Sequence, residues 1–311
     1  MLATSSSALA EPKRVTILLS NTDTYIQTAN TLREGLTSRG HVCTTIRFGR
    51  HLDSDNPPAE AAGESQRTIE AVIASRPDLV VTIGSSATAV AVQVPLQLDV
   101  IYCLVPNALD RPSISEQCAE RGRMTGIPAD LAPEHQVEWI QQLTPQIRHL
   151  GVFHSPRSRR TVEALAAAAE KVGLAVSAIP AGRENFADAV QALTDRGCDG
   201  VLMVADAEIY QSANVQRLLL WGLRGRRPVW AFSPSIVRAG ALAGLYVDNE
   251  AVAEQVIELV DRALSGENVF ESPVIYTTRV HSAWNERTAE LIGRSFPPRA
   301  LAPVTTRYSP N

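Results

Sequence analysis

The sequence repeats one pattern of predicted secondary structure. In each pass, an apolar strand-like run is followed by an amphipathic helical stretch, a glycine, a second strand, another helical stretch and a third strand. The first pass comprises Val15–Leu19, Thr28–Ser38, Gly40, Val42–Ile46, Thr68–Ala74 and Asp78–Ile83. The second comprises Leu150–His154, Thr161–Lys171, Gly173, Leu174–Ile179, Phe186–Thr194 and Asp199–Val204. Each pass alone predicts a right-handed βαβαβ unit with a parallel sheet.

Two such units in one chain predict two α/β lobes with a cleft between them. Ligands of such folds bind at the loops that follow the carboxyl ends of the strands. The fold class that we predict is therefore α/β, with two Rossmann-like doubly wound lobes whose parallel sheets are joined by a multi-strand hinge. The chain is expected to cross this hinge near Met124–Pro128, around or just after Phe232–Tyr246, and near Glu267–Pro273.

The lobes are expected to share the chain discontinuously. The predicted segments are a tail at 1–13, lobe one at 14–126 plus about 249–267, lobe two at 127–248 plus about 272–296, and a Pro-rich surface tail at 297–311. Asp248 and Asn249 are predicted to cap the helix that returns to lobe one. Pro273–Val280 is predicted as the last strand and Ala283–Ile292 as the last helix.

The composition is that of a globular protein without a spanning helix. Apolar residues make up 45% of the 311 residues and charged residues 20%, both ordinary values. The net charge of −4 argues against nucleic acid as a partner. No apolar run reaches the about 20 residues that cross a bilayer. Ala8-Leu9-Ala10 has the form of a signal-peptidase site and predicts the end of an incomplete export signal, with an ordinary cytoplasmic N-terminus as the alternative.

The four cysteines show neither redox nor metal-binding spacing. There is no C-x-x-C motif and no Cys/His set with zinc spacing. Cys43 and Cys103 lie in apolar strand contexts and are predicted to be small buried side chains. A disulfide between Cys103 and Cys118 is left open. We expect no metal site and no cofactor.

Several stretches, in this order, resemble a known family. They are "RPDLVVTIGSSATA", "TGIP", "LTPQIRHLGVFHSP", "AEKVGLAV", "CDGVLMVADAEIY", "RRPVWAFSPSIVRAGALAGLYVD" and "VDRALSGEN". With them the chain resembles the ABC-transporter substrate-binding proteins of type I periplasmic-binding-protein fold, in the branch whose better-known members bind aromatic amino acids. One departure is expected near His281-Ser282, where the family commonly has an Asn that opens the final helix.

The resemblance implies a solute-binding protein without catalytic activity. Such a protein captures a small molecule in the cleft by hinge closure and delivers it to the permease of an ABC importer. The ligand class that the resemblance implies is an amino acid or another small polar or aromatic metabolite. We expect a monomer located in the periplasm.

In lobe one, three polar turns at strand ends are candidate ligand contacts. Their residues are Asn21, Thr22 and Tyr25, then Gly84, Ser85 and Ser86, then Pro106 and Asn107. Glycine lets a ligand approach the backbone, and the two serines at a helix start suit a carboxylate or another anion. Tyr25 can stack on a ligand. Plain helix caps and a surface tyrosine are the structural alternatives.

In lobe two, the equivalent positions hold Ser155, Asp206, Phe232, Ser233 and Tyr246. Asp206 follows an apolar strand and is expected to accept a bond from a ligand ammonium or hydroxyl, or else to cap the next helix. Phe232 and Tyr246 are expected to sandwich a flat ligand, with core packing as the alternative. The hypothesis is that the Ser85-Ser86 turn holds the ligand first and that closure then brings the lobe-two residues over it.

Enzymatic motifs are missing from the sequence. There is no G-x-S-x-G elbow, no G-x-G-x-x-G or P-loop after a strand, and no histidine pair at i, i+4. A racemase-like enzyme with Cys103 and Cys198 as paired thiols is a minor alternative, because neither cysteine lies on a strand-end loop. A module that senses a ligand and signals to a membrane receptor or kinase is the main alternative.

Overall fold

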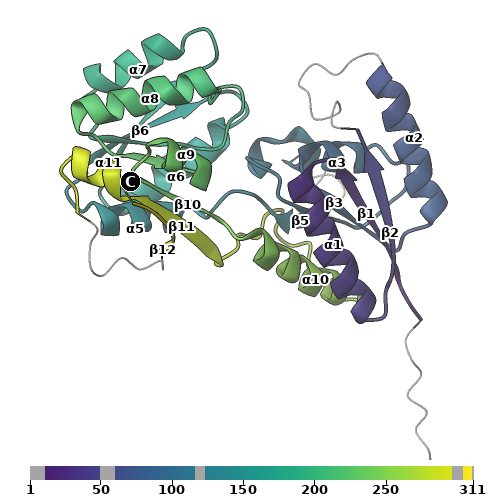
Figure 1. Ribbon diagram of the computed structural model, residues 1–311. Helices are drawn as coiled ribbons and strands as arrows, with labels where there is room; N and C mark the ends of the chain where they lie inside the picture. Colours follow the sequence, from purple (N-terminus) through teal and green to yellow (C-terminus); the bar gives the residue numbers. More distant parts are fainter. Residues whose placement is uncertain (1–10, 50–59, 116–122, 296–303, 310–311) are drawn as a thin grey trace, which may run out of the picture.

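The computed structural model describes residues 11–49, 60–115, 123–295 and 304–309. Figure 1 shows two lobes side by side, with helices on both faces of each sheet and extended segments running between the lobes. The prediction of two α/β lobes with parallel sheets is confirmed. None of the helices in these described ranges is long and apolar enough to cross a membrane.

Lobe one is a parallel sheet in the strand order β2-β1-β3-β4-β5. Its elements are β1 (Arg14–Ser20), α1 (Asp23–Ser38), β2 (Val42–Phe48), α2 (Glu60–Ser75), β3 (Leu79–Ile83), α3 (Ser85–Ala91), β4 (Val100–Cys103), the short 3-10 helix η2 (Ala108–Asp110) and β5 (Met124–Ile127). Every residue of β3 is buried, as expected for a parallel strand that is covered by helices on both faces.

Helix α10 (Asn249–Leu264) belongs to the core of lobe one, although it follows a strand of lobe two. Val252, Val256 and Val260 are fully buried in the same apolar cluster as Leu32 and Leu36 of α1. The spacing of four residues along each helix places these side chains in one stripe. The two helices therefore pack face to face, as Figure 1 shows.

Lobe two is a larger sheet in the order β12-β11-β10-β9-β8-β6-β7. Its elements are α5 (Pro133–Leu143), β6 (His149–His154), α6 (Arg159–Lys171), β7 (Ala175–Pro180), α7 (Phe186–Asp195), β8 (Gly200–Leu202), α8 (Ser212–Gly225), β9 (Val229–Ala231), α9 (Pro234–Ala239), β10 (Ala243–Val247), β11 (Val280–Asn285), α11 (Glu286–Leu291) and β12 (Val304–Tyr308). The β10–β11 pair is antiparallel and the other pairs are parallel.

The chain passes between the lobes after β5, between β10 and α10, and between α10 and β11. The last passage is tied to β5, because Thr125 Oγ1 donates to the carbonyl of Ser272 at 2.7 Å and Ile275 N–H donates to the carbonyl of Gly126 at 2.8 Å. Tyr102 adds a bond from its hydroxyl to the carbonyl of Pro273 at 2.6 Å. The segment predicted as the last strand is thus a connection fastened to lobe one.

The structure corrects the prediction for the last strand and helix. The strand is Val280–Asn285, because Ala283 and Trp284 are buried beside β10. The helix begins after Asn285, whose side chain accepts a bond from Thr288 N–H at 2.9 Å. The expected departure near His281-Ser282 is therefore wrong: an Asn does open the final helix, at Asn285.

The C-terminal segment contains a strand that was not predicted. β12 (Val304–Tyr308) pairs in parallel with β11 and forms the edge of the lobe-two sheet, where the sequence analysis expected only a surface tail. Other predictions fall outside the described residues, namely the tail up to residue 10 with its Ala8-Leu9-Ala10 site, and Cys118 of the open disulfide question.

Candidate ligand-binding site

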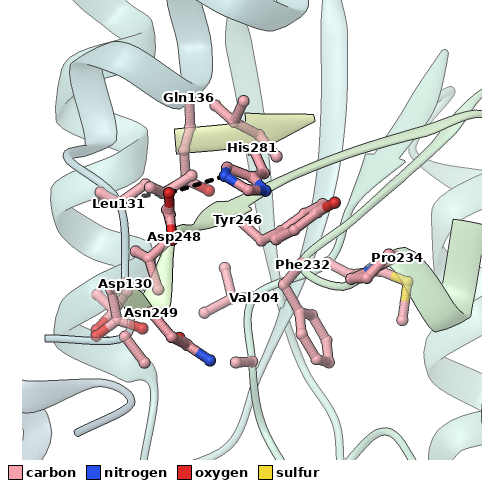
Figure 2. A pocket seen from close by; sticks show the side chains of 16 residues that line it. Asp130, Leu131, Gln136, Val204, Phe232, Pro234, Tyr246, Asp248, Asn249 and His281 are labelled. Atoms are coloured by element: carbon pink, nitrogen blue, oxygen red, sulfur yellow. Dashed lines mark hydrogen bonds and ion pairs between the residues drawn. The ribbon is translucent and has the colours of Figure 1, made fainter. Parts of the chain in front are cut away.

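A cavity of about 410 Å³ lies at the carboxyl ends of β8, β9 and β10, beside the passages between the lobes (Figure 2). This volume is in the range of small-molecule sites. Its lining residues are Ala129, Asp130, Leu131, Gln136, Thr161, Met203, Val204, Ala205, Phe232, Pro234, Leu245, Tyr246, Val247, Asp248, Asn249 and His281. They come from the end of β5 and the start of α10 as well as from lobe two, so the cavity belongs to the junction of the lobes.

Two aromatic rings that the sequence predicted for the site line this cavity. Phe232 directly follows β9 and Tyr246 lies near the end of β10, and Figure 2 shows both rings on the same side of the cavity. Both are only partly buried. The Tyr246 ring meets His281 edge-on at 5.8 Å, and the Phe232 ring lies 5.8 Å from Tyr210. The rings are therefore held by neighbours while part of their surface remains open to the cavity.

Asp130, which the sequence analysis did not single out, lies on another wall. It follows β5, and its carboxylate accepts a bond from Ala108 N–H at 3.3 Å. Burial raises the pKa of Asp130 to about 7, although bonds from the N–H groups of Ala108 and Asn107 and the charge of Arg111 act in the opposite direction. Carboxyl groups whose pKa is shifted in this way occur more often at functional sites than elsewhere in proteins.

Asp248 was predicted as a helix cap, and it has that role together with a place in the cavity. Its Oδ1 accepts from the N–H groups of Glu250 at 3.0 Å and Ala251 at 3.4 Å. Its Oδ2 lies 2.9 Å from Nε2 of His281 (Figure 2). Burial alone raises the pKa of Asp248, but the bonds from Ala251, His281 and Glu250 outweigh this and lower it. This carboxylate is therefore ionised at neutral pH.

Asp206 and Ser155 do not line the cavity but bind each other. Asp206 Oδ2 accepts from Ser155 Oγ at 2.7 Å and Ser158 Oγ at 2.6 Å, and its Oδ1 accepts from Glu208 N–H at 3.0 Å. Asp206 is only 6% exposed. Since residues of the chain already occupy both oxygens, this geometry indicates a local structural role. The alternative of a cap on the next helix is wrong, because the N-cap of α8 is Gln211. Ser155 instead lines a second hollow of about 660 Å³ between η2 and the ends of β6 and β7.

The lobe-one candidates around α1 and α3 are brought together at the ends of β1 and β3. The ring of Tyr25 covers Gly84 so closely that a Cβ at this position would lie 2.6 Å from its Cε2. Gly84 also has a φ of +85°, where a side chain is strained. Ser85 and Ser86 remain partly exposed, and Asn21 is exposed beside the half-buried Thr22. None of these residues lines the cavity.

Asn107 connects the two lobes. Its Nδ2 donates to the carbonyl of Ala205 at 2.5 Å, whereas its buried Oδ1 has no hydrogen-bond partner among the described residues. Asp110 makes a second connection: it accepts from the N–H groups of Arg160 at 2.7 Å and Thr161 at 2.9 Å at the start of α6. Pro106 is the residue before Asn107 in the sequence. Ser233 immediately precedes α9, and its hydroxyl lies 3.0 Å from that of Ser235.

The cysteines do not fit the racemase-like alternative. Cys103 lies in β4 with no exposed surface, and burial raises the pKa of its thiol to about 12. Cys198 is 1% exposed, and burial raises the pKa of its thiol as well. A catalytic thiol needs access and a stabilised thiolate, so these two side chains act as small apolar residues of the core.

Known structures share this fold over nearly the whole chain. The L-Trp complex of an ABC domain from Streptococcus pneumonia is 20% identical with a TM-score of 0.63, and the match covers 95% of this chain and 100% of that one. A conserved domain protein from Vibrio cholerae is 19% identical with a TM-score of 0.66, over 96% and 100%. A ligand-free, open substrate-binding protein with adhesive properties from Clostridium difficile is 16% identical with a TM-score of 0.71, over 96% and 100%.

No curated protein sequence matches the chain. The family described as "ABC transporter substrate binding protein" matches residues 21–301, which is most of the sequence. This match agrees with the doubly wound lobes and with the cavity at their junction. The chain belongs to the ABC transporter substrate-binding protein family.

Proposed function

We propose that the protein captures a small molecule in the cavity between its lobes and delivers it to an ABC importer. The observation that carries this proposal is the position of the cavity, since its lining combines the strand ends of lobe two with Asp130 and Asn249 at the passages between the lobes. A ligand held there touches the segments that must move when the lobes close. Family membership supports both capture and delivery to a permease.

Closure is proposed to turn ligand binding into a signal for the permease. A ligand shifts the balance between open and closed lobes only by the contacts that it makes better in the closed state. Phe232 and Tyr246 supply the first contacts from lobe two. The partly exposed hydroxyls of Ser85 and Ser86, at the strand ends of lobe one, are proposed to join on closure. The passages after β5, before α10 and before β11 serve as the hinge.

The aromatic pair favours a ligand with a flat apolar part. Leu131, Val204 and Leu245 add further apolar side chains to the lining of the cavity. A stacked or edge-on ring contributes about 0.5–1.5 kcal/mol beyond the apolar area that it buries. The L-Trp bound by the Streptococcus protein is a ligand of this shape. The proposal includes export to the periplasm and action as a monomer.

The proposal is tested by thermal unfolding of refolded protein against amino acids, arylalkylamines, aromatic acids, nucleobases and sugars. A true ligand at about 100 times its dissociation constant adds roughly 2.7 kcal/mol to the free energy of unfolding. Phe232→Ala is expected to weaken binding of that ligand about tenfold, because it removes one face of the cavity. Trp221→Ala, which removes a partly exposed ring of α8 outside the cavity and away from the passages between the lobes, is the matched control and is expected to bind normally.

If no compound in any class raises the unfolding temperature, solute capture is contradicted. Equal loss of binding in both variants contradicts the assignment of the cavity. Delivery has its own test: uptake of the labelled ligand by cells is expected to need both this protein and a permease. Uptake that persists without the protein, despite normal binding in vitro, points to a ligand sensor.

A further inference from the structure

Two acidic side chains and one histidine line the cavity. They are Asp130, Asp248 and His281, and no lysine or arginine is among the described lining residues. Asp248 holds a full negative charge and is bonded to His281 and to two N–H groups at the start of α10. The potential inside the cavity therefore favours a positive ligand over a negative one.

Asp130 has capacity to accept more bonds than it receives. A carboxylate offers about four lone-pair sites, and Asp130 is bonded by backbone N–H groups of the segment around η2. No described residue makes a salt bridge to it. The charged and titratable groups around it are Arg111, Asp110, Tyr276, Glu134 and the Asp248–His281 pair. Asp130 lines the cavity and is partly exposed, so its carboxylate is within reach of a ligand there.

The aromatic rings add a second preference for positive charge. Phe232 and Tyr246 both line the cavity, on the side away from Asp130 (Figure 2). The faces of such rings attract cations, with the strongest effect where water is excluded. A carboxylate in the same space meets two acidic side chains and the negative faces of two rings, with no arginine or lysine among the described lining residues to bind it.

We propose that this cavity selects an organic cation, in which an ammonium or amidinium group on a flat apolar body pairs with Asp130 while the body lies against Phe232 and Tyr246. The ligand carries no carboxylate of its own. This inference rests on the proposed capture of a solute in the same cavity and narrows its ligand class. Asp248 attracts the cation through the electrostatic potential of its charge, whereas Asp130 contacts the cation directly.

Matched pairs of compounds test the proposal, because they differ only in the carboxylate. Tryptamine is compared with tryptophan, tyramine with tyrosine, and agmatine with arginine, by titration calorimetry of the refolded full chain at pH 8. In the best-bound pair the amine is expected to bind at least about tenfold more tightly. Adding a carboxylate near two acidic side chains, with no lysine or arginine among the described lining residues, costs about 1.4 kcal/mol or more, which is a factor of ten.

The pH dependence of amine binding separates Asp130 from Asp248. Asp130 must be ionised to bind the ammonium, and its pKa of about 7 means that only about a tenth is ionised at pH 6. Amine affinity is therefore expected to fall about tenfold between pH 8 and pH 6, while the ammonium itself stays charged. Asp248, with its lowered pKa, gives no change in this interval.

Asp130→Asn keeps the shape and an oxygen for Ala108 N–H but removes the charge. It is expected to lose amine affinity at least tenfold and to lose the pH dependence, while the unfolding temperature without ligand is retained. Glu134→Gln is the matched control, because it removes a nearby exposed charge that pairs with Lys171 outside the cavity. Its amine binding is expected to stay within about twofold, as for exposed charges in general.

The inference is overturned if any amino acid binds as tightly as its amine, or if Asp130→Asn binds the amine normally. Both results leave solute capture intact, because a ligand still binds. It is also overturned if an anionic or neutral compound of the wider screen binds and the amines do not. Absence of binding by every compound overturns this inference and the proposed capture together.

Discussion

The turns after the third strand of the two repeats occupy the same place in the topology, yet they are filled in different ways. After β3 in lobe one, Gly84 is covered by the ring of Tyr25. After β8 in lobe two, Asp206 is bound by two serine hydroxyls from the turn after β6. Both turns are therefore occupied by side chains of the chain itself. The cavity lined by Phe232 and Tyr246 lies instead beside the passages between the lobes, at the ends of β8, β9 and β10. A second hollow borders the turn after β6.

This difference shows that equivalent positions in a duplicated fold need not have equivalent roles. The strand-end rule predicts the correct edge of each sheet, but it does not say which loops remain open to a ligand. A polar side chain that can hydrogen-bond a neighbouring turn is satisfied locally. The cavity is lined instead by partly buried residues such as Phe232, Tyr246 and Asp130.

The largest effect is expected from breaking the Asp206 turn. Asp206→Ala leaves Ser155 Oγ, Ser158 Oγ and Glu208 N–H without their acceptor, and bonds to a charged group contribute about 1.5–3 kcal/mol each. We expect a loss of roughly 3 kcal/mol in the free energy of unfolding, measured by urea denaturation. Asp188→Ala, at an exposed position in α7, is the control and is expected to change it by less than about 0.5 kcal/mol.

The opposite result returns Asp206 to the binding site. If Asp206→Ala unfolds normally but loses ligand affinity, the carboxylate contacts the ligand, as the sequence analysis expected. The two repeats then differ less than their hydrogen bonds indicate, since one of the two turns contributes directly to binding.

A smaller effect is expected from the corresponding turn of lobe one. Gly84→Ala places a Cβ against the Tyr25 ring at a φ of +85°, and we expect a loss of about 1–2 kcal/mol in the free energy of unfolding. Gly63→Ala in α2, where a Cβ meets nothing within 4 Å, is the control and is expected to be neutral or to stabilise by up to about 1 kcal/mol. If Tyr25 is first replaced by alanine, the loss of unfolding free energy caused by Gly84→Ala is expected to become smaller, because only the strain of the positive φ remains. If that loss does not change, the Cβ of Gly84→Ala does not clash with the Tyr25 ring.

The fold was predictable from sequence because its signals are local. Buried parallel strands such as β3 read as short apolar runs, and α1 shows its stripe of residues four apart. The last strands and the last helix were not predictable in the same way. Asn285 has the side chain of a helix cap, but Ala283 and Trp284 before it also fit the apolar pattern of the predicted helix. The β-branched and aromatic residues of Val304–Tyr308 are typical of a strand, but the Pro-rich sequence before them favours a surface tail.

The site was predictable only in part. Phe232 and Tyr246 follow apolar strands at the correct edge, so the strand-end rule finds them. Asp130 also follows a strand, but its contact with Ala108 at the start of η2 joins residues 22 positions apart in the sequence. No local pattern encodes such a contact. Asp248 was recognised as a cap, but its place in the cavity depends on His281 in a distant strand.

Small-angle X-ray scattering with and without the best ligand from the thermal screen tests capture between the lobes most directly. If the ligand binds in the cavity at the hinge and the lobes close on it, the radius of gyration falls on addition of ligand in the unaltered protein. At a free ligand concentration near the dissociation constant of the unaltered protein, the decrease for Phe232→Ala is expected to be much smaller, because tenfold weaker binding leaves only about a tenth of that variant occupied. A ligand that raises the unfolding temperature while the radius of gyration stays constant contradicts capture by closure.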